Sequence, residues 1–154
     1  MDALSVAGYI VRKGNEIGSP VSNLQLQKIL YFVQLESLKQ SKFSDEIINP
    51  AEFEAWLFGP VISEVYYAYC VNGGLPIIDV ANGTNLDFDF PPYIDEIVRR
   101  AVKTSPWNLV AISHREGGAW KQTYKEGCKL PINNDLIIKD AETFSMDCLG
   151  ECDF

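Results

Sequence analysis

The sequence has little of what most enzymes and nucleic-acid-binding proteins use. Its 154 residues include a single histidine, His114, and only 13 basic residues against 21 acidic ones, which gives a formal net charge of −8. Nucleic-acid binding relies on lysine and arginine to displace counterions from phosphates, so this balance disfavours nucleic acid as a partner. No apolar run approaches the roughly 20 residues of a membrane span, and the N-terminus lacks the features of a signal peptide. We therefore expect a cytoplasmic protein without membrane contacts.

Common catalytic and metal-binding motifs are also missing. The sequence contains no Gly-x-Ser-x-Gly elbow, no phosphate-binding loop, no His-Glu-x-x-His and no dinucleotide fingerprint. Its four cysteines form no Cys-x-x-Cys pair, and with one histidine a zinc site would need all four cysteines or a carboxylate. We therefore predict no cofactor and no metal site.

What the sequence does contain is apolar periodicity, which predicts a mainly helical domain of about six helices. Ser22 and Gln25 have the spacing of a capping box, and the segment after them is apolar on two faces. This pattern predicts a buried central helix that ends near residue 39. Cap residues and apolar spacing predict the other helices over residues 2–14, 60–71, 91–101, 106–114 and 134–144.

Two stretches favour a small β element. Residues 52–58 alternate between two faces, and residues 75–90 contain two β-leaning pieces around Asn82-Gly83, a pair that favours a hairpin turn. Gly59-Pro60 predicts a switch from extended chain to helix, with Gly59 in an unusual backbone conformation and Pro60 in the first helical turn.

The chain shows no internal repeat and no linker, which predicts one domain over residues 1–145 and an acidic tail over 146–154. The acidic residues from Asp140 to Asp153 are interpreted as a solvated face and a tail. An acidic surface that complements a basic partner is the alternative.

Several side chains allow both a structural and a functional interpretation. His114 could act as a general base oriented by Glu116, or it could hold the turn at a helix C-terminus. The aromatic residues around Gly59 could be core or could line a groove for a partner. Lys28, in the middle of the central helix, is expected to reach solvent or to pair with Glu54 or Glu64.

Three segments together resemble the Panacea domain, the SocA-like family of bacterial and phage-associated proteins. They are VSNLQLQKILYF (21–32), EAWLFGPVISEVY (54–66) and LVAISHREGGAW (109–120). Phe58 and Ala119 depart from the family pattern, which commonly has tyrosine and proline at these positions. The family-motif residues that we interpret as structural are Lys28, Tyr31, Gly59, Pro60, His114 and Trp120.

The resemblance implies an antitoxin that neutralises, by direct binding, a cognate toxin encoded nearby, and it implies no enzymatic activity. The candidate partner-binding residues are Trp56, Glu64, Tyr66 and Tyr67, because aromatic anchors beside charged residues are typical of protein interfaces. The alternatives are a proteolytic adaptor, a transcriptional regulator of phage or bacterial origin, or an enzyme that uses His114. The sequence is also compatible with a homodimer.

Overall fold

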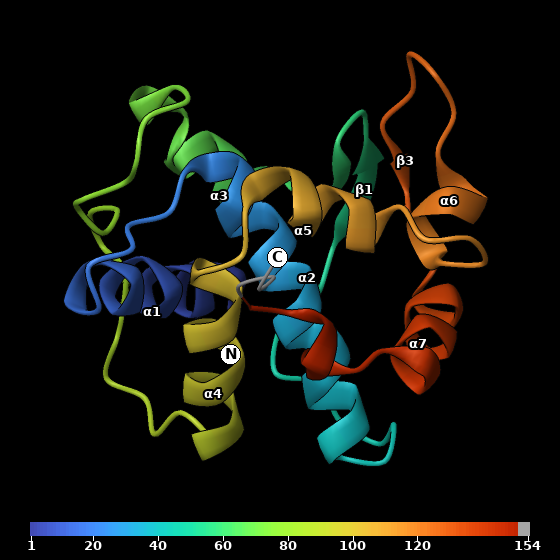
Figure 1. Cartoon of the computed structure of the whole chain (residues 1–154), viewed down its shortest axis with the longest axis horizontal. Helices are drawn as coiled ribbons and strands as arrows, with labels where there is room; N and C mark the ends of the chain where they lie inside the picture. Colours follow the sequence, from blue (N-terminus) through green and yellow to red (C-terminus); the bar gives the residue numbers. More distant parts are fainter. Residues whose placement is uncertain (151–154) are drawn as a thin grey trace.

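The central element is the helix α2, Asn23–Gln40, and the other helices pack around it (Figure 1). The computed structural model describes residues 1–150. The Ser22 hydroxyl accepts a hydrogen bond from the Gln25 backbone N–H, and the Gln25 side chain accepts one from the Ser22 N–H. The predicted capping box and the predicted central helix are therefore confirmed. Both apolar faces of α2 are buried, including Leu26, Ile29, Leu30, Tyr31, Val33 and Leu35.

The prediction of a mainly helical domain is also confirmed, with seven α-helices and two short 3₁₀ segments within residues 1–150 in place of about six helices. The elements besides α2 are α1 (Ala3–Glu16), α3 (Ser63–Ala68), η1 (Cys70–Asn72), α4 (Pro92–Val102), α5 (Pro106–Ser113), α6 (Ala119–Thr123), α7 (Asn134–Thr143) and η2 (Met146–Cys148). Gly14 does not end α1 as expected but lies buried inside it. Asn133 caps α7 by accepting a hydrogen bond from Asp135 N–H, whereas the sequence allowed either Asn133 or Asn134 as the cap.

A three-stranded antiparallel sheet in the order β2-β1-β3 lies beside the helices, with β1 at Phe53–Trp56, β2 at Gly59–Ile62 and β3 at Leu130–Pro131. The prediction that Pro60 begins a helix is wrong, because Pro60 lies in β2 opposite Ala55 and the next helix begins only at Ser63. Proline lacks a backbone N–H and is therefore tolerated in an edge strand such as β2.

The predicted β structure within residues 75–90 is also wrong, because no strand forms there. The segment lies across α1, where a Cβ atom added to Gly8 would stand 2.7 Å from Thr84 Cγ2 and 3.0 Å from Leu86 Cδ2. The backbone N–H of Ile77 donates to Val21 O rather than to a partner strand. Close packing on a helix replaces the hairpin that the local sequence favours.

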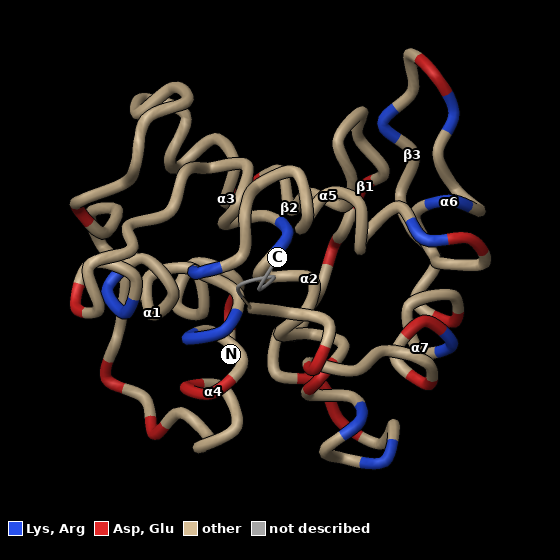
Figure 2. The backbone as a smooth tube through the Cα atoms, viewed as in Figure 1, with Lys and Arg blue, Asp and Glu red and all other residues tan. Residues whose placement is uncertain are grey.

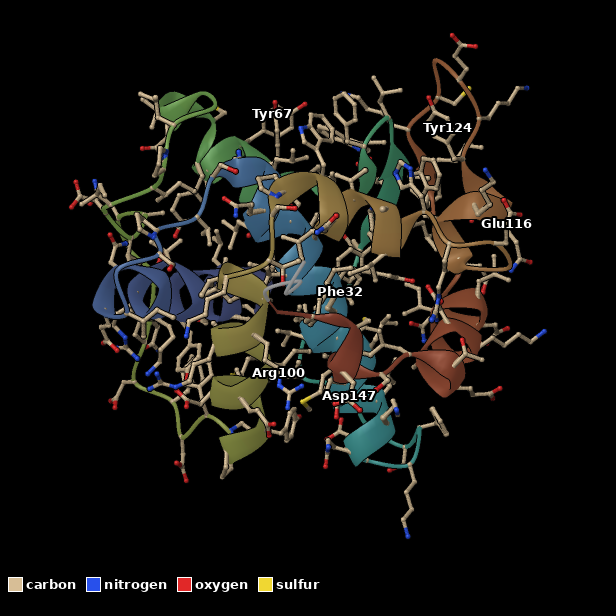
Figure 3. The ribbon with its side chains drawn as sticks, in the orientation of Figure 1. Phe32, Tyr67, Arg100, Glu116, Tyr124 and Asp147 are labelled. Carbon is tan, nitrogen blue, oxygen red and sulfur yellow. The ribbon has the colours of Figure 1, made fainter. Side chains whose placement is uncertain are left out.

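Acidic residues are spread over α1, α4, α7 and the loops between elements rather than gathered on one element (Figure 2). Part of the predicted tail packs on the domain. Asp147 pairs with Arg100 at 3.2 Å (both labelled in Figure 3), and the Gly150 N–H donates to Thr104 Oγ1 at 2.8 Å. Residues 151–154 of the predicted tail lie outside the described residues. Among the described helices, none combines the length and apolar character needed to cross a bilayer.

Candidate functional site

The tip of the β1–β2 hairpin carries apolar side chains into solvent. Trp56 pairs with Gly59 across the hairpin, so Leu57 and Phe58 alone form its turn. Leu57 is 61% exposed and Phe58 is 45% exposed. Gly59 has a φ of 120°, a conformation that residues with a side chain rarely adopt. This finding agrees with the prediction that Gly59 provides an unusual backbone angle.

Lys28 lies beneath this hairpin and has no exposed surface. Its ammonium group donates a hydrogen bond to the Pro60 carbonyl oxygen at 2.8 Å. Burial disfavours the charged form and lowers the pKa of the Lys28 amine to about 7. The prediction that Lys28 reaches solvent or pairs with Glu54 or Glu64 is wrong, because the buried nitrogen meets a backbone carbonyl instead.

His114 and Trp120 connect the β1–β2 hairpin to the C-terminal part of the domain through a ring stack and a hydrogen bond. The ring of His114, the C-cap of α5, stacks on Trp120 with ring centroids 3.5 Å apart. The Trp120 indole N–H then donates to the Trp56 carbonyl oxygen at 2.7 Å. Burial and, secondarily, the nearby charge of Lys28 lower the pKa of His114, so its imidazole is neutral at neutral pH.

The catalytic interpretation of His114 requires Glu116 to orient its ring. Glu116 instead pairs with Lys121 at 3.6 Å, its side chain is 90% exposed, and it lies at the outer edge of the molecule (Figure 3). The Nε2 atom of His114 has no hydrogen-bond partner among residues 1–150. Over the same range, no group of three or more His, Cys, Asp or Glu side chains is placed to hold a metal ion. This geometry provides no orienting carboxylate for His114.

A groove of about 530 Å³ opens between the hairpin tip and the starts of α2 and α5. Trp107 on α5 is 62% exposed and contacts Phe58 edge to face, with ring centroids 5.5 Å apart. Two buried side chains of α2 fix the opposite wall: the Asn23 amide donates to Tyr66 O, and the Gln27 carbonyl accepts from Ile62 N–H. We call this feature the aromatic groove; it is lined by Ser22, Asn23, Leu24, Gln27, Lys28, Trp56, Leu57, Phe58, Val61, Tyr66, Gly73, Gly74, Pro106 and Trp107.

Three of the four candidate partner-binding residues come together at this groove. Trp56 and Tyr66 lie 4.9 Å apart between ring centroids, and Tyr67 lies 5.5 Å from Tyr66 and 6.4 Å from Trp56. Tyr67 belongs to α3 and is 60% exposed at the surface (Figure 3). Glu64 is exposed on the first turn of α3 but does not line the groove.

Trp107 and Lys129 also reach this site, although neither was among the predicted site residues. The packing of α5 on β2 brings Trp107 to the hairpin. In the sequence, Trp107 is distinguished only by its position directly after Pro106, which begins α5. The ammonium group of Lys129 lies 4.0 Å from the centre of the Trp56 ring, a cation–π distance. Both contacts join residues distant in sequence, so no local pattern indicates them.

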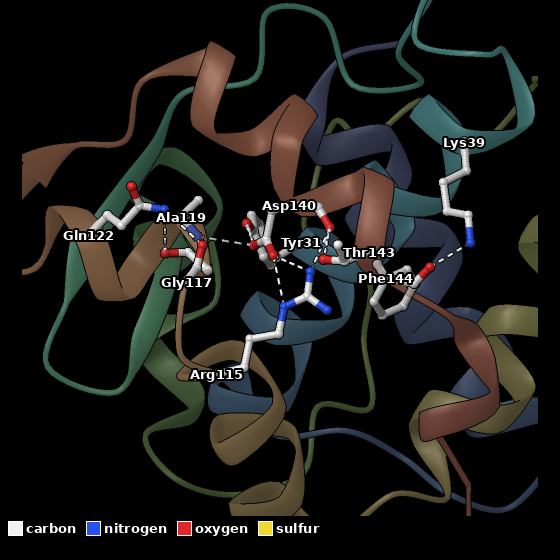
Figure 4. Close-up of polar contacts among 10 residues, drawn as sticks. Tyr31, Lys39, Arg115, Gly117, Ala119, Gln122, Asp140, Thr143 and Phe144 are labelled. Carbon is white, nitrogen blue, oxygen red and sulfur yellow. Dashed lines mark hydrogen bonds and ion pairs between the residues drawn. The ribbon is translucent and has the colours of Figure 1, made fainter.

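A second cluster joins three helices around Asp140 (Figure 4). Its carboxylate accepts hydrogen bonds from the Tyr31 hydroxyl on α2, from the Arg115 guanidinium and from the Ala119 backbone N–H. Asp140 is 5% exposed. The interpretation of Asp140 as part of a solvated acidic face is therefore wrong, and it is instead an anchor for α7 that sequence reasoning missed.

Comparison with known proteins places this geometry in a family. The family model described as "Antitoxin SocA-like, Panacea domain" matches residues 26–90, which include most of α2, the hairpin and α3. The curated Antitoxin SocA of Caulobacter vibrioides (strain NA1000 / CB15N) is 34% identical over 132 residues, which span 78% of this chain and 69% of that protein. No solved structure matches the chain. The chain belongs to the family of Antitoxin SocA-like proteins with a Panacea domain.

Proposed function

We propose that this protein neutralises a toxin by binding it directly through the aromatic groove and the adjacent Tyr67. The observation that carries the proposal is the set of large apolar side chains exposed around one groove: Leu57, Phe58, Tyr67 and Trp107 are each 45% exposed or more. Exposed apolar patches of this kind mark interaction sites, because covering them with a partner removes apolar surface from water and so lowers the free energy.

Hydrogen bonds hold the segments that carry these side chains in place, which favours a preformed binding surface. Trp120 holds the hairpin through the Trp56 carbonyl, and Gln27 holds β2 through the Ile62 N–H. A preorganised surface loses little conformational entropy on association, which leaves more of the contact energy for affinity. Each protein molecule would then mask one toxin molecule, without turnover.

The test is co-expression of the protein with the product of a neighbouring gene that arrests growth on its own. Growth rescue should rise in proportion to the amount of protein and saturate near a stoichiometric ratio, because masking consumes one binder for each toxin. Full rescue at a small fraction of the toxin's concentration would refute masking and indicate catalysis or delivery for degradation.

Tyr67→Ala tests the surface itself. The substitution should weaken toxin binding by about 1–3 kcal/mol in a calorimetric titration, because exposed aromatic anchors carry much of an interface's energy. Phe88→Ala is the matched control, since Phe88 is also an exposed aromatic (37%) but packs against Phe90, whereas Tyr67 contacts Trp56 and Tyr66 of the groove lining. Equal affinities of the two variants would show that the toxin binds elsewhere.

A further inference from the structure

The charge at the aromatic groove is opposite to the charge of the whole molecule. The chain carries a formal charge of −8, yet the groove lining contains one basic side chain, Lys28, and no acidic one, and a second lysine, Lys129, contacts Trp56 of the lining. Neither lysine forms an ion pair with a carboxylate within residues 1–150, whereas Lys13 and Lys121 do. Lys129, together with Lys28 when its amine is protonated, therefore gives this groove positive charge without a paired carboxylate in an acidic protein.

Lys129 is the accessible cation of this pair. It lies on the loop between α6 and β3, which Figure 2 places beside β1, and its side chain is exposed. The Trp56 ring holds the ammonium group at the rim from one side only. Its remaining N–H donors stay available to an anion that approaches from the groove.

Lys28 adds to the positive potential from below. Its stem and nitrogen are buried, and its one hydrogen-bond partner within residues 1–150 is the neutral Pro60 carbonyl. Burial lowers the pKa of this amine to about 7, so the amine carries its proton in only part of the protein molecules at neutral pH. Water screens a buried charge less than an exposed one, so the protonated form acts on an anion in the groove above it. Apolar walls made by Phe58 and Trp107 strengthen this effect by excluding water.

We infer that the aromatic groove binds a partner segment in which one acidic side chain is flanked by apolar residues. The carboxylate pairs with Lys129 above Trp56, and the apolar neighbours pack against Phe58 and Trp107. This inference rests on the proposed function and specifies the chemistry of the toxin surface that the groove recognises. A basic segment fits less well, because the exposed Glu64 lies outside the groove lining. A nucleic-acid backbone would need more cations than these two.

The test uses two pools of nine-residue peptides with blocked ends, applied to the immobilised full-length protein. Both pools have apolar residues around a central position, which is glutamate in one pool and glutamine in the other. Retention of the glutamate pool should exceed that of the glutamine pool about tenfold, because a hydrogen bond to a charged group is stronger than one between neutral groups. Equal retention of the two pools, or retention of neither, would overturn the inference.

Lys129→Met should reduce retention of the glutamate pool to the level of the glutamine pool. Lys139→Met is the matched control, because Lys139 is also exposed and unpaired within residues 1–150 but lies on α7. Persistence of the glutamate preference in Lys129→Met would contradict the assigned pairing. If toxin titration still gives stoichiometric rescue while the pools bind equally, the carboxylate inference fails and the proposed function stands. Absence of stoichiometric rescue refutes the proposed function, whatever the peptides show.

Discussion

A methyl group at position 59 would stand 2.7 Å from Lys28 Cε and 2.7 Å from Ser113 Oγ. These distances are shorter than real Cβ contacts, and both neighbours are buried, so neither can move into solvent. The φ of 120° adds backbone strain for any other residue. Glycine at this position thus lets the hairpin, α2 and α5 meet at one point.

Gly59→Ala should therefore lower the free energy of unfolding by about 2–4 kcal/mol, from overpacking and backbone strain together. Gly83→Ala separates the two causes, because Gly83 also has a positive φ of 81° but has no atom within 4 Å of the added methyl group. Urea denaturation of both variants provides the measurement. A loss at position 59 no larger than that at position 83 would show that the close approach to Lys28 is unimportant.

Among the elements, α7 depends on one buried carboxylate for its attachment to α2 and α6 (Figure 4). Asp140→Asn removes the negative charge that faces Arg115 and leaves a partly buried guanidinium without its counterion. The loss of one partner of a buried pair is strongly destabilising, so we expect the free energy of unfolding to fall by about 2–4 kcal/mol. Thermal denaturation followed by circular dichroism measures it.

Glu142→Gln is the control for that substitution, since Glu142 is exposed on the same helix and forms no ion pair within residues 1–150. Its stability should change by less than about 0.5 kcal/mol. If Asp140→Asn has an effect this small, the cluster does not anchor α7, and the packing of Ile137 and Ala141 must hold the helix alone.

Among the helices and strands, those determined by neighbouring residues could be predicted from the sequence, and those determined by contacts between distant residues could not. Ser22 and Gln25 define the start of α2 by themselves, because a capping box involves four consecutive residues. Residues 75–90 have a β-leaning composition, but Thr84 and Leu86 of this segment pack over Gly8, which is far away in the chain, and no local pattern encodes that contact. Pro60 was misassigned for the same reason, since proline suits an edge strand and a helix start equally well.

The candidate site could likewise be predicted only in part from the sequence. The sequence brings Trp56, Tyr66 and Tyr67 together through one short hairpin and helix, so their proximity could be inferred. Trp107 and Lys129 reach the same surface only through the packing of α5 and β3 onto the hairpin. Contacts between such distant segments require the tertiary structure.

For the whole molecule, the buried amine of Lys28 couples folding to pH. The pKa of this group falls from 10.5 to about 7 on folding, because burial penalises the ammonium form. Below pH 7 both the folded and the unfolded chain carry the proton, and the full penalty opposes folding. Above pH 7 the folded chain loses the proton while the unfolded chain keeps it up to about pH 10.5. Stability therefore rises with pH across this window.

Between pH 7 and 8.5, the free energy of unfolding of the wild-type protein should rise by up to about 2 kcal/mol, since the limiting slope is about 1.4 kcal/mol per pH unit. This interval lies above the ordinary pKa of His114 and below those of the buried tyrosines Tyr31 and Tyr69, whose pKa values burial raises. Lys28→Met keeps most of the stem and removes the amine, so its stability should be nearly constant over the same interval. Urea denaturation of both proteins at several pH values provides the comparison. Parallel pH dependence of the two would show that another group releases the proton and that Lys28 remains charged beneath the hairpin.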